Sequence, residues 1–144
     1  MAYMTIPTLL VAQDGSLDLS FDTDGIVLTQ FGNSDNYCNA FAFQSDGKIV
    51  ATGFTFIGSV TIIALARYNV DGSLDTSFDN DGKVTTDIGS IGSMGEALKI
   101  QADGKIVVAG KTNNGSIYDF LVLRYNTNGS LDSTFDGDGI VITP

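Results

Sequence analysis

Histidine is absent from this sequence of 144 residues, and basic residues, cysteine and long apolar runs are scarce. Without histidine, the chain cannot form a catalytic triad that uses an imidazole base, nor a metal site with histidine ligands. The serines that recur in the turns, Ser16, Ser73 and Ser130, lie outside any nucleophile-elbow motif. We therefore expect no catalytic residues in this chain and predict that it is not an enzyme.

The sequence also contains few positively charged residues. Seven lysines and arginines stand against 17 acidic residues, which gives a net charge of -10 at pH 7. A nucleic acid or an anionic membrane surface is bound by a positive face, so neither is an expected partner. Glu96 is the only glutamate, and all the other acidic residues are aspartates. Aspartate is common in turns and is a poor helix former, which favours β structure.

Cysteine and apolar runs are also in short supply. Cys38 is the only cysteine, which excludes an internal disulfide bond, and we expect it to fill a small gap in the core. Residues 1–13 contain no basic residue, and their apolar run from Thr8 to Ala12 is short. This pattern is typical neither of a signal peptide nor of a membrane span, so we expect no membrane insertion.

What the chain does contain is a repeat with a period of 57 residues. The motif Asp-Gly-Ser-Leu-Asp-x-Ser-Phe-Asp-x-Asp-Gly begins at Asp14 and again at Asp71, and a close variant begins at Asn128. A second motif, Gln-x-Asp-Gly-Lys-Ile-Val, begins at Gln44 and again at Gln101. A fixed period of this size without insertions is the mark of a repeat architecture.

The repeat unit contains a predicted hairpin. Apolar residues do not recur with a helical period; they form short runs between Gly, Asp and Asn. Asp46-Gly47 and its copy Asp103-Gly104 each join two such runs, which is typical of a hairpin with a type I′ turn, where φ is positive at both central residues. We therefore expect residues 38–44 to pair with 48–55, and residues 95–101 to pair with 105–112.

Two further strands complete the predicted unit. Residues 61–69 and 118–126 are apolar on both faces, so these strands should lie inside a stack of sheets. A fourth strand is expected at 83–88, with counterparts at 26–31 and 140–143. Four short strands in 57 residues are the size of one β-propeller blade.

The same residues resemble a known family. The runs Gly-Ser-Leu-Asp-x-Ser-Phe, Asp-Gly-x-Val-x-Thr, Gln-x-Asp-Gly-Lys-Ile-Val and Arg-Tyr-Asn are similar to the bacterial delta-60 repeat, and the resemblance covers nearly everything from Asp14 to Thr143. The family is a β-propeller repeat of unknown function that occurs as long tandem arrays in large, often secreted or surface proteins. The resemblance implies a propeller fold and a secreted or cell-surface location in bacteria, with a signal outside this chain. It implies no catalytic residues.

The predicted organisation is all-β, with about two and a half propeller blades of four antiparallel strands. Residues 38–94 and 95–144 would form two complete blades. Residues 1–37 would form a partial blade, made of the strand at 26–31 and a divergent partner within residues 3–12. Propellers close at about four to eight blades. The expected partners are therefore further blades of the same protein or other copies of this chain.

Nine aspartates are the strongest chemical candidates. They form an acidic loop in each repeat: Asp18, Asp22 and Asp24; Asp75, Asp79 and Asp81; and Asp132, Asp136 and Asp138. Carboxylates at alternate positions followed by glycine can surround a hard cation such as Ca²⁺, although no bidentate glutamate follows here. Alternatively, these aspartates form Asx-turns and cap backbone amides. Ca²⁺ is thus a possible cofactor, and the only one the sequence suggests.

Two other sets of residues are candidates for contacts. Arg67 and Arg124, the only arginines, occupy the same repeat position. We expect each to pair with a loop carboxylate, Asp18, Asp75 or Asp132, since a semi-buried guanidinium must be neutralised. Phe54 and Phe56 have no aromatic counterpart in the next repeat. They could contact a glycan or a protein ligand, or cover the apolar N-terminal segment.

The sequence therefore predicts a non-catalytic β-propeller repeat module that serves as a binding or structural scaffold in a larger or oligomeric assembly. Two alternatives stay open. The chain could be a fragment of a propeller enzyme whose catalytic residues lie elsewhere, or a self-assembling extracellular protein that forms a ring or fibre.

Overall fold

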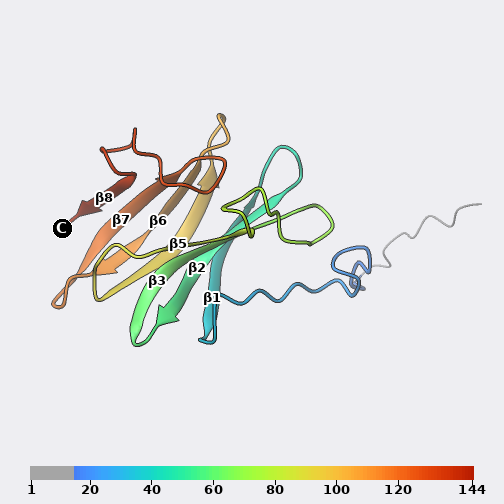
Figure 1. Ribbon diagram of the computed structural model, residues 1–144, viewed down its shortest axis with the longest axis horizontal. Coiled ribbons are helices and arrows are strands. Elements are labelled where there is room, and N and C mark those ends of the chain that lie inside the picture. The colour runs from blue at the N-terminus through green and yellow to red at the C-terminus, as the bar shows by residue number, and fades with distance from the viewer. Residues whose placement is uncertain (1–14) are drawn as a thin grey trace, which may run out of the picture.

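The computed structural model describes residues 15–144, which form eight β-strands (Figure 1). No helix occurs in this range, and hence none that is long and apolar enough to cross a membrane. The strands form two four-stranded sheets in which every neighbouring pair is antiparallel. Sheet A consists of β1 (Asn36–Phe43), β2 (Ile49–Ile57), β3 (Val60–Tyr68) and β4 (Lys83–Thr86), in that order. Sheet B consists of β5 (Gly92–Ile100), β6 (Ile106–Asn113), β7 (Tyr118–Tyr125) and β8 (Ile140–Thr143), also in chain order.

This arrangement confirms the predicted fold class of four-stranded propeller blades with a 57-residue period. Each of the eight strands overlaps a predicted strand. The inner strands begin earlier than expected, at Asn36 instead of 38 and at Gly92 instead of 95. We refer to sheet A and sheet B, with their loops, as blade 1 and blade 2.

The turn between β1 and β2 differs in type from the expected one. Gly47 has a φ of 85°, but Asp46 is not among the residues with positive φ, so the turn is not of type I′. The amide of Gly47 donates to the carbonyl of Gln44 (3.0 Å), and the amide of Gln44 donates to the carbonyl of Lys48 (2.8 Å). The loop is thus one residue longer and ends on a left-handed glycine. The Asp46 carboxylate stabilises this turn by accepting a hydrogen bond from the amide of Lys48 (3.2 Å).

A bulge interrupts the pairing of the inner strand in both blades. The register shifts between Cys38 and Ala40 in blade 1, and between Gly95 and Ala97 in blade 2. The residue opposite the bulge in blade 1 is Gly53, where an added Cβ would overlap the carbonyl oxygen of Tyr37. Only glycine leaves room for the bulged backbone at this position.

The two sheets pack face to face through one apolar core. It contains Val50, Ile63, Leu65, Phe78 and Val84 from blade 1, and Ile106, Val108, Leu121, Leu123 and Tyr125 from blade 2. We call the face of sheet B that contacts sheet A its leading face, and the opposite face its trailing face. Sheet A correspondingly contacts sheet B through its own trailing face. Within this interface, the Tyr125 hydroxyl and the Thr86 hydroxyl are hydrogen-bonded at 2.8 Å.

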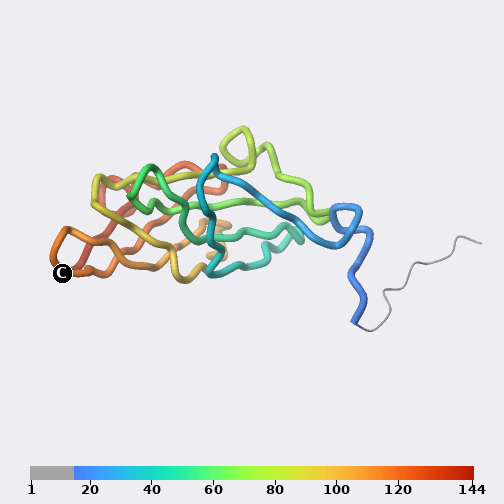
Figure 2. Tube along the Cα trace, turned by 90° about the horizontal axis from the view of Figure 1, so that it is seen from below, coloured from blue at the N-terminus to red at the C-terminus, as the bar shows by residue number. Residues whose placement is uncertain are grey.

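Residues 15–35 lie along the leading face of sheet A, at the end of the molecule opposite the C-terminus (Figure 2). The Tyr68 hydroxyl donates to Thr29 (2.7 Å), as Tyr125 contacts Thr86 one repeat later. Similarly, the amide of Asp22 donates to the carbonyl of Asp71 (2.8 Å). One repeat later, the amide of Asp79 donates to the carbonyl of Asn128 in the same way. The segment therefore contacts blade 1 as the loop and outer strand of blade 1 contact blade 2.

Residues 26–31 nevertheless form no strand, contrary to the prediction. A strand requires a hydrogen-bonded neighbour, and the described residues offer this segment none. The expected partner, within residues 3–12, lies outside the described residues. The partial blade at residues 1–37 therefore stays a prediction.

Candidate functional site: the charged junctions and the uncovered blade face

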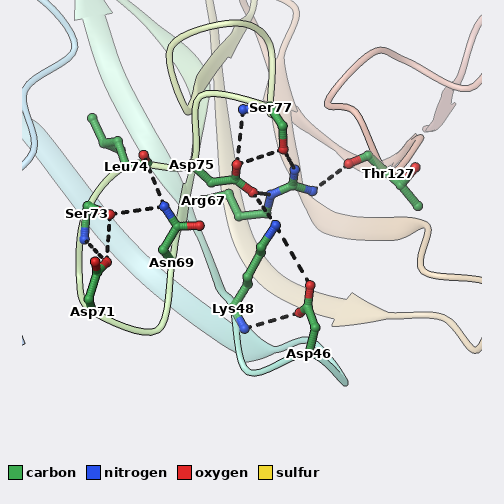
Figure 3. A network of polar contacts seen from close by, with 10 residues as sticks. All are labelled: Asp46, Lys48, Arg67, Asn69, Asp71, Ser73, Leu74, Asp75, Ser77 and Thr127. Atoms are coloured by element: carbon green, nitrogen blue, oxygen red, sulfur yellow. Dashed lines mark hydrogen bonds and ion pairs between the residues drawn. The ribbon is translucent and has the colours of Figure 1, made fainter.

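A buried ion pair closes one end of blade 1 (Figure 3). Arg67, on β3, donates from Nε to Oδ2 of Asp75 at 2.8 Å. Lys48, which directly precedes β2, places its Nζ 2.8 Å from the same oxygen. The amide and hydroxyl of Ser77 donate to the other carboxylate oxygen at 3.0 and 2.7 Å. Asp75 is 6% exposed, so a buried carboxylate is satisfied by two cations and by its own loop.

Blade 2 repeats this charged junction. Arg124 and Lys105 bind Oδ2 of Asp132 at 2.6 and 2.8 Å, and Thr134 takes the place of serine. The predicted pairing of each arginine with a loop carboxylate is confirmed. The contribution of Lys48 and Lys105 was not anticipated, although both stand in the repeated Asp-Gly-Lys motif.

Electrostatics within the junctions favour the charged carboxylates. Burial acts to raise the pKa of Asp75, but hydrogen bonds from Lys48 and Ser77, together with the charge of Arg67, outweigh it and hold this pKa well below its ordinary value. In blade 2, hydrogen bonds from Lys105 and Thr134 lower the pKa of Asp132 in the same way. Both carboxylates therefore remain ionised through the neutral and mildly acidic range.

A pH prediction follows for Asp75. Because its pKa is lower in the folded than in the unfolded chain, its stabilising contribution is complete above the unfolded value of about 3.9 and is lost as the pH falls below it. We expect the free energy of unfolding, measured with urea, to decrease from pH 5 to pH 3. Ser77→Ala removes one bond that lowers this pKa, so the decrease should become shallower in that variant. An identical slope in both proteins would contradict the assignment.

The junction of blade 1 also reaches across to blade 2. Nη1 of Arg67 donates to the carbonyl oxygen of Thr127, and its guanidinium lies 4.6 Å from the ring centre of buried Phe78. Arg124 makes no equivalent bond to a following blade within residues 15–144. Its side chain is consequently 21% exposed, compared with 6% for Arg67.

The nine candidate aspartates do not converge. Asp75 and Asp132 belong to the charged junctions. Four others accept from the backbone amide two residues ahead: Asp18 from Ser20, Asp24 from Ile26, Asp81 from Lys83, and Asp138 from Ile140. The remaining three, Asp22, Asp79 and Asp136, have positive φ values of 48°, 48° and 51°.

Six of the nine aspartates accept from the amide two residues ahead, which is the geometry of Asx-turns, the alternative that the sequence left open. Residues 15–144 contain no group of three Cys, Asp or Glu side chains placed to hold a metal ion. Calcium binding by the acidic loops therefore stays a prediction.

No part of residues 15–144 covers the trailing face of sheet B. Phe120 and Tyr118 on β7 are 78% and 60% exposed. Together with Lys111 and Glu96, they border an open hollow of about 550 Å³. The equivalent of Phe120 in blade 1 is Ile63, which is 0% exposed because blade 2 covers it. An apolar face of this kind is typical of an interaction surface.

The leading face of sheet A carries a second hollow, of about 340 Å³, beneath residues 15–35. Its lining includes Phe21, Leu28, Phe41, Tyr68 and the thiol-bearing residue Cys38. Cys38 is exposed, so the expectation that it fills a gap in the core is wrong. The residue lies beside the bulge, on the face where blade 1 has no further sheet to cover it among the described residues.

The two phenylalanines that distinguish blade 1 pack with a third aromatic residue. Tyr37 stacks on Phe54 with ring centres 4.6 Å apart and an interplanar angle of 12°. Phe56 meets both rings edge-on. Tyr37 is 49% exposed, so the group presents one aromatic face to solvent. The sequence did not reveal the role of Tyr37; the register that pairs it with Phe54 could have done so only once the bulge was known.

The comparison with known proteins agrees with the fold. Residues 44–78 and 101–135 each match a family model described as "Domain of unknown function (DUF5122) beta-propeller". Each matched segment runs from the β-hairpin turn to the phenylalanine of the acidic loop. No curated protein and no solved structure matches the chain. The match confirms the predicted β-propeller repeat family of unknown function, whereas the delta-60 name stays a prediction.

Proposed function

Because the chain carries two repeats of the DUF5122 beta-propeller family, we propose that it is a non-catalytic module whose blades act as a binding and structural scaffold within a larger or oligomeric propeller. The uncovered trailing face of sheet B carries this proposal. It has the same strand arrangement as the trailing face of sheet A, which is buried by a following blade.

The partner that fits this face best is another blade of the same repeat. In blade 1, Ile63 and Leu65 are both 0% exposed against blade 2, whereas their counterparts in blade 2 are Phe120, which is 78% exposed, and the half-buried Val122. Covering this face would remove apolar area from water, at roughly 25 cal/mol for each Å². A blade shaped like the leading face of sheet B, which covers the trailing face of sheet A, would bury this area.

Polar groups at the junction of the two blades support the same partner. Arg67 binds the carbonyl of Thr127 in the following blade, and Thr86 bonds the Tyr125 hydroxyl. The corresponding groups of blade 2, Arg124 and Thr143, lie at the uncovered face. A following blade with the same repeat would bring a carbonyl and a tyrosine hydroxyl to them.

The source of that blade is either further repeats of the same polypeptide or a second copy of this chain. A second copy would have to approach with the leading face of sheet A, which already contacts residues 15–35. Those residues occupy the position that β8 and its loop would take at such a junction. Association between copies therefore requires this segment to move, and blades of the same polypeptide face no such competition.

Static light scattering across a range of concentrations tests the surface. We expect the chain to associate above its monomer mass of 15.2 kDa. Phe120→Asp should weaken association by about thirtyfold, because it places a charge at the centre of the apolar face and removes about 2 kcal/mol of contact energy. Ile117→Asp is the matched control: it changes an exposed residue of the β6–β7 turn, outside the face, and should leave association unchanged.

A folded monomer at every concentration would count against a second copy as the partner. Equal association of the wild-type chain and of Phe120→Asp would count against the trailing face as the surface that mediates it.

A further inference from the structure

Three buried polar side chains form a row across sheet B. The β2–β3 and β6–β7 turns lie at the same end of the two blades (Figure 1), and the row is near this end. Ser93 on β5 pairs with Thr112 on β6, which in turn pairs with Asp119 on β7. Directly paired residues of neighbouring strands share one face, so all three side chains lie side by side. They are 2%, 3% and 7% exposed, because their leading face is covered by blade 1.

Hydrogen bonds within the protein satisfy this row only in part. Oδ2 of Asp119 accepts from Nδ2 of Asn114 at 3.0 Å, and the Thr112 hydroxyl donates to the carbonyl of Gly92 at 3.4 Å. Oδ1 of Asp119 and the Ser93 hydroxyl, both fully buried, have no hydrogen-bond partner among residues 15–144. Leaving a buried carboxylate oxygen without a partner costs free energy of folding. We therefore expect a further group to bind the free oxygens of this row.

No side-chain cation of the described residues meets this need. Lys111 is the nearest along β6, but it lies on the trailing face, where it pairs with Glu96 at 3.0 Å and with the ring of Tyr118. Lys48, Lys105 and the two arginines are engaged in the charged junctions, where they bind Asp75 and Asp132. Lys83 lies 3.7 Å from Asp81 and donates to the carbonyl of Gln30, and Lys99 pairs with Val107 at the other end of β5.

Thr61 of blade 1 lies beside the start of β5, next to this row. Thr61, on β3, is 8% exposed and faces Gly92, where an added Cβ would come within 2.8 Å of its Oγ1. The row itself offers one carboxylate and two hydroxyl oxygens. Oxygen ligands of this kind suit hard cations, Ca²⁺ above all, with water completing the coordination.

We propose that Ser93, Thr112 and Asp119 form a calcium site at the junction of the two blades. The site is specific to this junction. The corresponding row in blade 1 consists of Asn36, Thr55 and Ile62, in which isoleucine replaces the carboxylate. It is also separate from the acidic loops, which lie at the opposite end of the strands.

Thermal unfolding with Ca²⁺ or with a chelator tests this site. With one carboxylate, the site should bind Ca²⁺ with a dissociation constant of about 1 mM. At about 10 mM Ca²⁺ the melting temperature of the chain should then rise by about 5 °C. Asp119→Asn should abolish the rise, and Ser93→Ala should reduce it. Asp81→Asn, which alters an acidic loop, should leave it unchanged.

Three outcomes would overturn the proposal: no calcium-dependent shift in the wild-type chain, a full shift in Asp119→Asn, or loss of the shift in Asp81→Asn with retention in Asp119→Asn. Since Asp119→Asn also removes a buried charge, calorimetric titration of Ca²⁺ into folded Ser93→Ala provides a second measurement. Affinity equal to that of the wild-type chain would exclude Ser93 from the site.

Discussion

Replacing Arg67 by alanine should lower the free energy of unfolding by about 3 kcal/mol, the lower end of the range for breaking a buried ion pair. The guanidinium is bound to Asp75, lies over the ring of Phe78 and donates to the carbonyl of Thr127 in blade 2. Its removal leaves that carbonyl without its donor and weakens the contact between the blades. Lys48 continues to neutralise Asp75, which keeps the loss from being larger.

Arg124→Ala is the matched control for this substitution. Arg124 has the same intrablade partners, but it makes no bond to a following blade within the described part of the chain, and its side chain is 21% exposed. We expect a loss of roughly 1–2 kcal/mol, in the range for a hydrogen bond to a charged group. Urea unfolding of the two variants gives the comparison. Equal losses would show that the contact with Thr127 contributes nothing to stability.

Replacing Gly53 by alanine should be comparably damaging, at about 3 kcal/mol, the upper end of the usual cost of overpacking. The added Cβ would overlap the carbonyl of Tyr37 at the bulge, where two backbone segments approach each other closely. The backbone would have to move, and with it the aromatic stack of Tyr37 on Phe54. Near-ultraviolet circular dichroism of the aromatic residues, recorded alongside urea unfolding, reports both effects.

Gly58→Ala separates this steric effect from the usual cost of replacing glycine. Gly58 has a positive φ of 63° and no atom within 4 Å of an added Cβ, so only backbone strain opposes alanine there. That strain costs about 1 kcal/mol. If Gly53→Ala were no more destabilising than Gly58→Ala, the bulged backbone of blade 1 would be free to adjust, and glycine would not be required at Gly53.

The architecture could be predicted from the sequence because two independent signals agree. The 57-residue period sets the unit, and the Asp46-Gly47 turn between apolar runs sets the pairing of β1 with β2. The arginine partners were also predictable, since a buried guanidinium requires a carboxylate and each repeat brings Asp75 or Asp132 within reach.

Features that depend on strand register could not be predicted in the same way. The bulge shifts the inner strand by one residue, which no composition or period reveals. Cys38 is exposed because no further sheet among the described residues covers its face, whereas its counterpart Gly95 is buried against blade 1. The row of Ser93, Thr112 and Asp119 comes from three strands and has no motif in the sequence. Residues 26–31 carry a strand pattern, yet a strand also requires a neighbour to pair with.

The contacts between consecutive repeats have a consequence for how such a chain can grow. The bond of Thr29 with Tyr68 and that of Thr86 with Tyr125 both span 39 residues, and the second follows the first by one period of 57 residues. Duplication of any 57-residue segment would therefore reproduce every junction in register, wherever its ends fall. A gain or loss of another length would change the spacing of 60 residues that joins Arg67 to the carbonyl of Thr127. Evolution can lengthen the array by whole blades without designing a new interface.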